Sequence, residues 1–174
     1  QSETISLVRS GNWSDISIWP NEIIPPADSR ITIPQGLTLT VDSEIAYRYK
    51  RIQIDGTLQF ATDVNTLLTV ETIRSSMSGT LRVGTSTNPV KPNVRTRVIF
   101  ADYGDIDRTK DPKELGRGAI LMGKTEIFGA EKTSWLALES PPKRGDTVLH
   151  LSKPVVGWQI GDVLVVAGTA PMDP

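Results

Sequence analysis

A short glycine-led element recurs along the chain and constrains its fold more than any other feature. Gly56-Thr-Leu-Gln-Phe60 returns 23 residues later as Gly79-Thr-Leu-Arg-Val83, and Gly36-Leu-Thr-Leu-Thr40 begins 20 residues before the first copy. A repeat of about 20–25 residues made of short strands and glycine turns is typical of a solenoid, in which each coil buries its apolar face against the next. The spacing therefore predicts an all-β chain folded as a right-handed parallel β-helix.

Apolar and polar residues alternate around these glycines. The apolar positions of the first two stretches are Ile31, Ile33, Leu37, Leu39 and Val41, then Ile52, Ile54, Leu58 and Phe60. Such alternation places one face of a strand in a core and the other in water. An antiparallel β-sandwich with a turn every ~8–12 residues would show the same alternation, and it is the alternative fold.

Three parts are expected along the chain. Residues 1–30 are interpreted as an N-terminal cap, 31–168 as β-helix coils and 169–174 as the start of a following segment. Trp13 and Trp19 precede the first coil and would cover its bare edge. Ser14 and Asp15 are expected to cap a short helical turn there. Val163 to Ala167 is interpreted as a buried strand close to the end of the sequence, as in a piece of a longer protein.

Composition excludes several classes of chemistry. The 174 residues include no Cys and one His, His150, and the net charge is −1. Thiol nucleophiles, disulfide scaffolds, thiolate zinc sites and multi-histidine metal centres are therefore excluded. The near-neutral charge argues against a general nucleic-acid binder. No apolar run is long enough for a transmembrane helix, so membrane insertion is not expected.

A charged stretch at residues 101–118 is the first candidate functional segment. Its Asp102, Asp105 and Asp107 are candidates for the carboxylate pair of a glycoside hydrolase, or for Ca²⁺ ligands. The alternative interpretation is a solvated turn, since Asp side chains bond the nearby backbone. No other cofactor or metal site is indicated.

Basic residues interleaved with aromatic ones form the second candidate. Tyr47, Arg48, Lys50 and Arg51 lie together, and Arg108 and Lys110 add cations within the charged stretch. Lys91, Arg95 and Arg97 make a further basic group. These side chains suit contact with an acidic glycan through charge and stacking. The alternative is a solvated edge that discourages strand pairing.

Several residues are expected to serve the fold rather than a ligand. They are three tryptophans and a series of turn glycines: Trp13, Trp19, Trp158, Gly36, Gly56, Gly79, Gly84, Gly123, Gly129 and Gly161.

An ordered set of motifs covering nearly the whole chain resembles the G-eight domain, which is named for its eight glycines and occurs in fibrocystin, in the cell-migration-inducing hyaluronan-binding protein and in secreted bacterial proteins. The motifs are Gly11-Asn-Trp-Ser-Asp15, Trp19-Pro20, Pro25-Pro-Ala-Asp28, Arg30-Ile-Thr-Ile-Pro-Gln-Gly36, Ile54-Asp-Gly-Thr-Leu58, Gly79-Thr-Leu-Arg-Val-Gly84, Gly118-Ala-Ile-Leu-Met-Gly123, Glu126-Ile-Phe-Gly129 and Trp158 to Ala167. Two positions depart from the pattern. Asn21-Glu22 stands where many members carry two glycines, and Phe128 stands where a His often precedes the glycine.

The resemblance implies a secreted or cell-surface protein whose β-helix continues into further β-helical coils. It also implies an association with polysaccharide or glycosaminoglycan, including hyaluronan, and no catalytic residue is carried over from it. The leading hypothesis is a binding or supporting module, and no catalysis is expected of this chain alone. The alternatives are a hyaluronidase-like glycoside hydrolase that uses the acidic residues of 101–118, and a structural or adhesion module.

Overall fold

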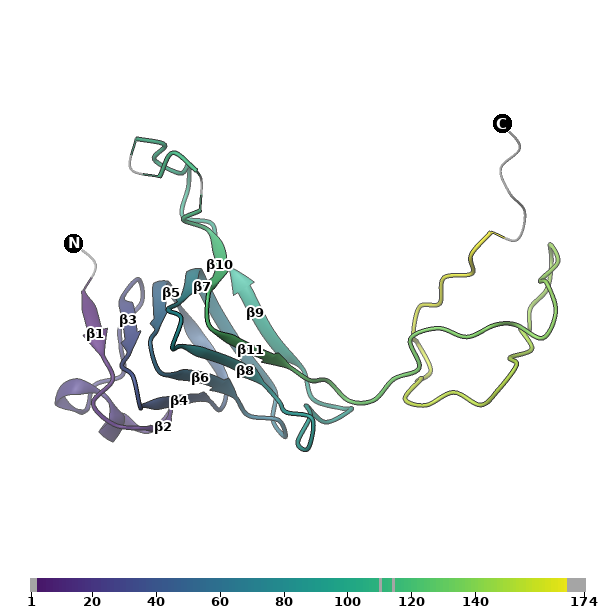
Figure 1. Cartoon of the computed structure of the whole chain (residues 1–174), viewed down its shortest axis with the longest axis horizontal. Helices are drawn as coiled ribbons and strands as arrows, with labels where there is room; N and C mark the ends of the chain where they lie inside the picture. Colours follow the sequence, from purple (N-terminus) through teal and green to yellow (C-terminus); the bar gives the residue numbers. More distant parts are fainter. Residues whose placement is uncertain (1–2, 110, 114, 169–174) are drawn as a thin grey trace. The chain divides into compact units, whose positions relative to one another are not determined.

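The computed structural model describes residues 3–109, 111–113 and 115–168 (Figure 1). It divides the chain into two units, Gln1–Gly129 and Ala130–Pro174. The named strands of the described residues all lie in the first unit and form two sheets. Sheet A contains β1 (Thr4–Ser6), β3 (Arg30–Ile33), β5 (Glu44–Ile54), β7 (Thr66–Ser75), β9 (Thr96–Phe100) and β10 (Gly118–Leu121). Sheet B contains β2 (Gly11–Asn12), β4 (Thr38–Val41), β6 (Thr57–Phe60), β8 (Thr80–Val83) and β11 (Lys124–Ile127).

The chain passes alternately from sheet A to sheet B, and each strand pairs with the strand of the repeat before it. The order is β1-β3-β5-β7-β10 in sheet A and β2-β4-β6-β8-β11 in sheet B. Every pairing between these named strands is parallel. The all-β prediction is confirmed, and the parallel pairing is not that of the alternative antiparallel sandwich.

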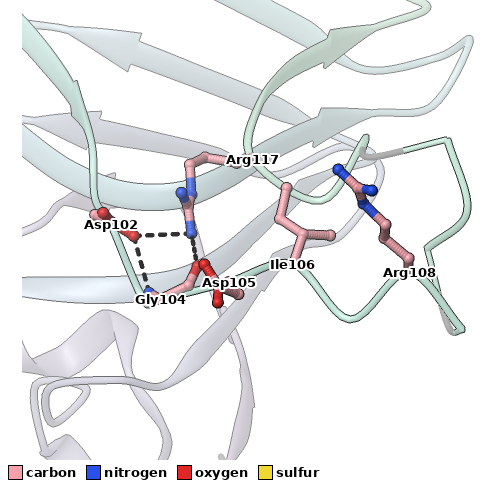
Figure 2. Close-up of a pocket in the computed structure, with 6 residues that line it drawn as sticks. All are labelled: Asp102, Gly104, Asp105, Ile106, Arg108 and Arg117. Carbon is pink, nitrogen blue, oxygen red and sulfur yellow. Dashed lines mark hydrogen bonds and ion pairs between the residues drawn. The ribbon is translucent and has the colours of Figure 1, made fainter.

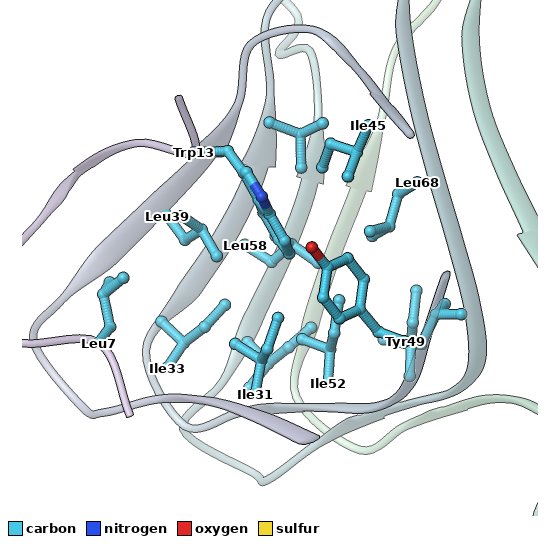
Figure 3. Close-up of a cluster of buried hydrophobic side chains, with 14 of the residues drawn as sticks. Leu7, Trp13, Ile31, Ile33, Leu39, Ile45, Tyr49, Ile52, Leu58 and Leu68 are labelled. Carbon is cyan, nitrogen blue, oxygen red and sulfur yellow. The ribbon is translucent and has the colours of Figure 1, made fainter. Parts of the chain in front are cut away.

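Equivalent residues of successive repeats stack on one another in the core. Ile31, Ile52 and Ile73 are register partners in sheet A, each at most 1% exposed. Leu39, Leu58 and Leu81 form the corresponding row in sheet B. Figure 3 shows Ile31, Ile52, Leu39 and Leu58 of these rows gathered between the strands, with Trp13 and Tyr49 among them. Burying each such aliphatic side chain contributes roughly 1.5–3 kcal/mol, which explains why the apolar positions recur at the repeat spacing.

Gly56, Gly79 and Gly123 lie at the corner between the two sheets, where successive repeats approach too closely for a side chain, whereas Gly36 has open space around it. A Cβ on Gly56 would overlap the carbonyl oxygen of Pro34, and one on Gly79 would overlap that of Ile54. Gly123 meets the carbonyl oxygen of Gly79 in the same way. Close backbone approach therefore requires glycine at these three corners.

One repeat of sheet A is broken into two strands. β9 pairs with the first half of β7, from Thr66↔Thr96 to Val70↔Phe100. β10 pairs with the second half of the same strand, beginning at Thr72↔Gly118. The intervening segment, residues 101–117, is thus an insertion inside one repeat, and its described residues project beyond these strand ends (Figure 1).

Two tryptophans of the N-terminal segment are buried against each other. Trp13 and Trp19 are at most 2% exposed and meet edge to face with ring centroids 5.3 Å apart. The Trp19 Nε1–H donates to the Trp13 carbonyl at 3.0 Å, and the Trp13 ring lies 5.2 Å from the Tyr49 ring. Desolvation by burial raises the pKa of Tyr49. This phenol therefore stays protonated and donates to the Pro25 carbonyl.

Two short 3₁₀ helices, η1 (Ile16–Ile18) and η2 (Pro20–Glu22), lie in the same segment. Asp15, and not Ser14, caps η1, because its carboxylate accepts the Ser17 amide hydrogen. Ser14 instead donates its hydroxyl to Asp42 at 2.5 Å. Asn21 and Glu22, which stand where many G-eight domains carry two glycines, have φ of 57° and 56°.

The second unit differs from the expectation that coils continue to residue 168. Among its described residues the only bridge is an isolated antiparallel one, Leu138↔Leu151, and the Trp158 indole donates to the Thr133 carbonyl at 2.7 Å. The prediction of a buried strand at Val163 to Ala167 is wrong, since Val163 is 91% exposed. An apolar segment of a solenoid is buried only where a neighbouring strand packs on it, and no described strand pairs with residues 163–167. The segment expected at 169–174 lies outside the described residues.

Candidate functional site

The two candidate segments singled out in the sequence meet at one place. The Tyr103 hydroxyl, from the 101–117 insertion, donates to the Asp28 carboxylate at 2.6 Å. The Arg48 guanidinium carbon lies 4.4 Å from the centroid of the Tyr103 ring, and the Lys50 ammonium lies 5.4 Å from it. Arg48 also pairs with Asp28 at 3.5 Å. We name this region the loop-and-edge surface. It comprises Asp28, Tyr47, Arg48, Lys50, Arg51 and Tyr103, together with the residues that line a hollow in the insertion: Asp102, Gly104, Asp105, Ile106, Arg108 and Arg117.

The position of these side chains follows from strand β5. Tyr49 points into the core, so Arg48 and Lys50 on either side of it point outward. A register shift between Glu44 and Arg48 leaves Tyr47 outward too, at 52% exposure. Arg51 is also exposed.

Tyr103 is held as a hydrogen-bond donor. Desolvation raises its pKa, and the bond to the Asp28 carboxylate raises it further, because an ionised phenol would face a negative charge. The flat ring lies under two cations, an arrangement that stabilises both. Tyr103 thus fastens the insertion to the outer face of sheet A.

A hollow of about 560 Å³ opens within the same insertion, among residues on either side of Tyr103 in the sequence (Figure 2). Its lining residues are Asp102, Gly104, Asp105, Ile106, Arg108 and Arg117. Arg117 forms an ion pair with Asp102 at 2.9 Å and donates to the Gly104 carbonyl, while the Gly104 amide donates to Asp102 at 2.8 Å. These bonds brace the base of the insertion.

The predicted catalytic carboxylates occupy different surroundings. Asp102 is in the ion pair just described, with its side chain 79% exposed. Asp107 accepts the Thr109 amide hydrogen at 3.0 Å, which is the local turn bonding of the alternative interpretation. Asp105 is exposed at the hollow. A general acid normally needs a buried, apolar setting, and the exposed Asp102 lacks one.

The same carboxylates were the candidates for metal ligation. Over the described ranges, no three His, Asp or Glu side chains gather closely enough to hold an ion. The Ca²⁺ expectation is not tested by this arrangement.

The predicted cations are distributed unevenly. Arg108 lines the hollow, whereas Lys110 lies outside the described residues. Of the further basic group, Arg97 forms an ion pair with Glu44 at 2.8 Å. Lys91 is exposed in the segment between β8 and β9, where it lines a groove that was not predicted from the sequence.

This second feature lies on the outer face of sheet B and encloses about 420 Å³. We name it the sheet-B groove: Thr40, Gln59, Phe60, Ala61, Thr62, Asp63, Arg82, Gly84, Thr85, Asn88 and Lys91. Gln59 and Arg82 are register partners on β6 and β8, opposite in direction to the buried Leu58 and Leu81.

A signal for the groove is present in the repeat itself. Gln59 and Arg82 hold the same place, the fourth, in the two copies of the Gly-Thr-Leu element. Stacking of equivalent positions brings them side by side.

Comparison with known proteins gives two findings. The family model of the G8 domain matches residues 18–139. Protein rliB of Dictyostelium discoideum is 26% identical over 164 residues, which cover 89% of this chain and 14% of that protein. No solved structure matches. A search of the described residues for a helix of the length and apolar character needed to cross a membrane finds none.

Proposed function

Because the chain belongs to the G8 domain family, we propose that it is a secreted or cell-surface module that binds polysaccharide as part of a larger β-helical protein. Two alternating parallel sheets with stacked cores support a right-handed β-helical solenoid. The chain covers only 14% of the length of protein rliB, which supports its being a module of something longer.

The observation that carries the binding role is the contact of Tyr103 with Arg48 and Lys50. It brings two segments distant in sequence, each rich in cations, onto one exposed surface. A guanidinium offers paired donors that match carboxylate and sulfate groups, and an ammonium adds a compact charge. The loop-and-edge surface thus suits an acidic polysaccharide such as a glycosaminoglycan.

The arrangement also sets which cations are available to a ligand. Arg48 and Arg117 each pair with a carboxylate of the surface, Asp28 and Asp102 respectively. Lys50 and Arg51 on β5 extend the cationic side of this surface. We expect the latter pair to contribute most of the affinity for a polyanion.

The test is binding of the 174-residue chain to immobilised hyaluronan, chondroitin sulfate and an uncharged polysaccharide. The double variant Lys50→Ala/Arg51→Ala should weaken binding to the acidic polymers about tenfold, equivalent to about 1.4 kcal/mol. Binding should also fall with rising salt, since exposed charges are screened. The matched control is Arg144→Ala/Lys153→Ala, which removes two exposed cations from the second unit.

If wild type, the double variant and the control variant all bind the acidic polymers equally well, the acidic ligand binds elsewhere. Failure of wild type to bind any of these polymers would refute the binding role.

A further inference from the structure

We propose that the sheet-B groove is a second saccharide site, and that it takes an uncharged, hydroxyl-rich chain. It lies on the outer face of the other sheet, among residues that the loop-and-edge surface does not include. The inference therefore goes beyond the proposed binding of an acidic polymer.

The floor of the groove is a row of polar side chains that runs across the strands. Thr40, Gln59 and Arg82 line the groove and are successive register partners on β4, β6 and β8, and Glu126 of β11 continues the row beyond the lining. Neighbouring strands are about 4.8 Å apart, so the row presents a polar group at each such step along the stack. A linear polymer with hydroxyl groups at regular intervals matches this kind of repeat.

Internal bonds hold the row in place. The Gln59 amide nitrogen donates to the Thr40 hydroxyl at 2.9 Å. The Arg82 Nε donates to the Glu126 carboxylate at 2.8 Å, and Lys124 reaches the same carboxylate at 2.9 Å. Side chains fixed before a ligand arrives lose little entropy on binding it, and so favour affinity.

The wall adds further hydrogen-bonding groups. The Thr62 hydroxyl donates to the Asn88 side-chain oxygen at 3.3 Å, and both residues line the groove. The Thr85 hydroxyl accepts the Asn88 backbone hydrogen. Amide, hydroxyl and guanidinium groups together offer both donors and acceptors, as sugar hydroxyls require.

Charge selects the class of ligand. The lining holds two cations, Arg82 and Lys91, and one anion, Asp63, while Glu126 neutralises Arg82 from the end of the row. Lys124 also pairs with Glu126, so three cations stand against two anions, and the net charge of one gives a polyanion little attraction here. An uncharged glycan meets the hydrogen-bonding row without bringing a charge that must be desolvated.

The test is a titration of the same chain with neutral cello-, malto- and chito-oligosaccharides, followed by NMR at the backbone amides. At least one of these should shift the amides of Gln59, Arg82 and Asn88, with a dissociation constant unchanged by added salt. Gln59→Ala should weaken this binding about fivefold, the value of roughly one hydrogen bond. Gln53→Ala is the matched control, since Gln53 is an outward glutamine on sheet A that bonds only its neighbour Asp55 among the described contacts.

Three results would overturn the inference: no shift at the groove with any neutral oligosaccharide, binding abolished by salt, or equal affinities for Gln59→Ala and Gln53→Ala. The Lys50→Ala/Arg51→Ala variant separates the two proposals. It should retain groove binding even if it loses the acidic polymer, and the reverse should hold for Gln59→Ala.

Discussion

Replacing Gly79 by alanine tests the structural reason for the glycine repeat. Gly79 is buried at the sheet corner and its φ is not in the left-handed region, so alanine can adopt its backbone conformation. The added Cβ would lie 3.0 Å from the Ile54 carbonyl carbon and 3.1 Å from the Ser75 Cβ, and still closer to the Ile54 oxygen. The atoms in the way belong to backbone and to a buried strand, so they cannot swing aside.

The cost should fall at the upper end of overpacking, about 3 kcal/mol, because neighbouring repeats must separate locally. This corresponds to a loss of more than ~100-fold in the folding equilibrium constant. Urea unfolding followed by circular dichroism measures it. Gly129→Ala is the matched control, since its φ is ordinary and a Cβ added there would meet no atom of another part of the chain within 4 Å.

The control should be neutral or stabilising by about 0.5 kcal/mol, as alanine restricts the unfolded chain. If Gly79→Ala costs no more than Gly129→Ala, close stacking is not the reason for the glycine.

Two further predictions concern the N-terminal segment and sheet B. Glu22→Gly should stabilise the fold by about 0.5–1 kcal/mol in urea unfolding. A φ of 56° costs a non-glycine residue about 1–2 kcal/mol, and the greater freedom of glycine in the unfolded chain offsets part of the gain. A loss of stability would contradict this reasoning. Hydrogen bonds from Arg82 and then Lys124 lower the pKa of Glu126 below its usual 4.5, so its stabilising contribution is present above that pH and is lost as pH falls through the lowered pKa. Arg82→Ala should therefore raise the pKa of Glu126, measured by NMR titration, and an unchanged value would refute the assignment.

The all-β fold was predictable because the repeat and the alternation both indicate short strands with one face buried in a core. Ile52 and Leu58 are buried in the structure as alternation requires. Glycine recurs at positions 56 and 79 because the same close contact with the backbone of the preceding repeat occurs at both. Alternation could not decide between parallel and antiparallel pairing, whereas the spacing of the repeated glycine-led element favoured parallel pairing. The composition of Val163 to Ala167 predicted burial wrongly, since burial depends on a neighbouring strand that composition does not supply.

The candidate site was predictable in its parts but not in its geometry. Charge and aromatic content singled out Arg48 and the 101–118 stretch separately, yet the stacking of Tyr103 on Arg48 depends on where the insertion leaves sheet A. The groove was missed because its residues, such as Gln59, look like ordinary solvent-facing strand positions. Only the stacking of repeats turns isolated polar residues into a continuous row.

The broken repeat has a consequence for how this protein can diversify. The strands that flank the insertion end and restart at Val70 and Thr72 of β7, two positions apart on one strand. The ends of the insertion are thus anchored close together by the sheet, whatever lies between them. Each doubling of such a segment's length costs only about 0.6 kcal/mol of closure entropy. The connection between β9 and β10 is therefore a position where a peptide or a whole domain could be inserted without disturbing the stacked strands.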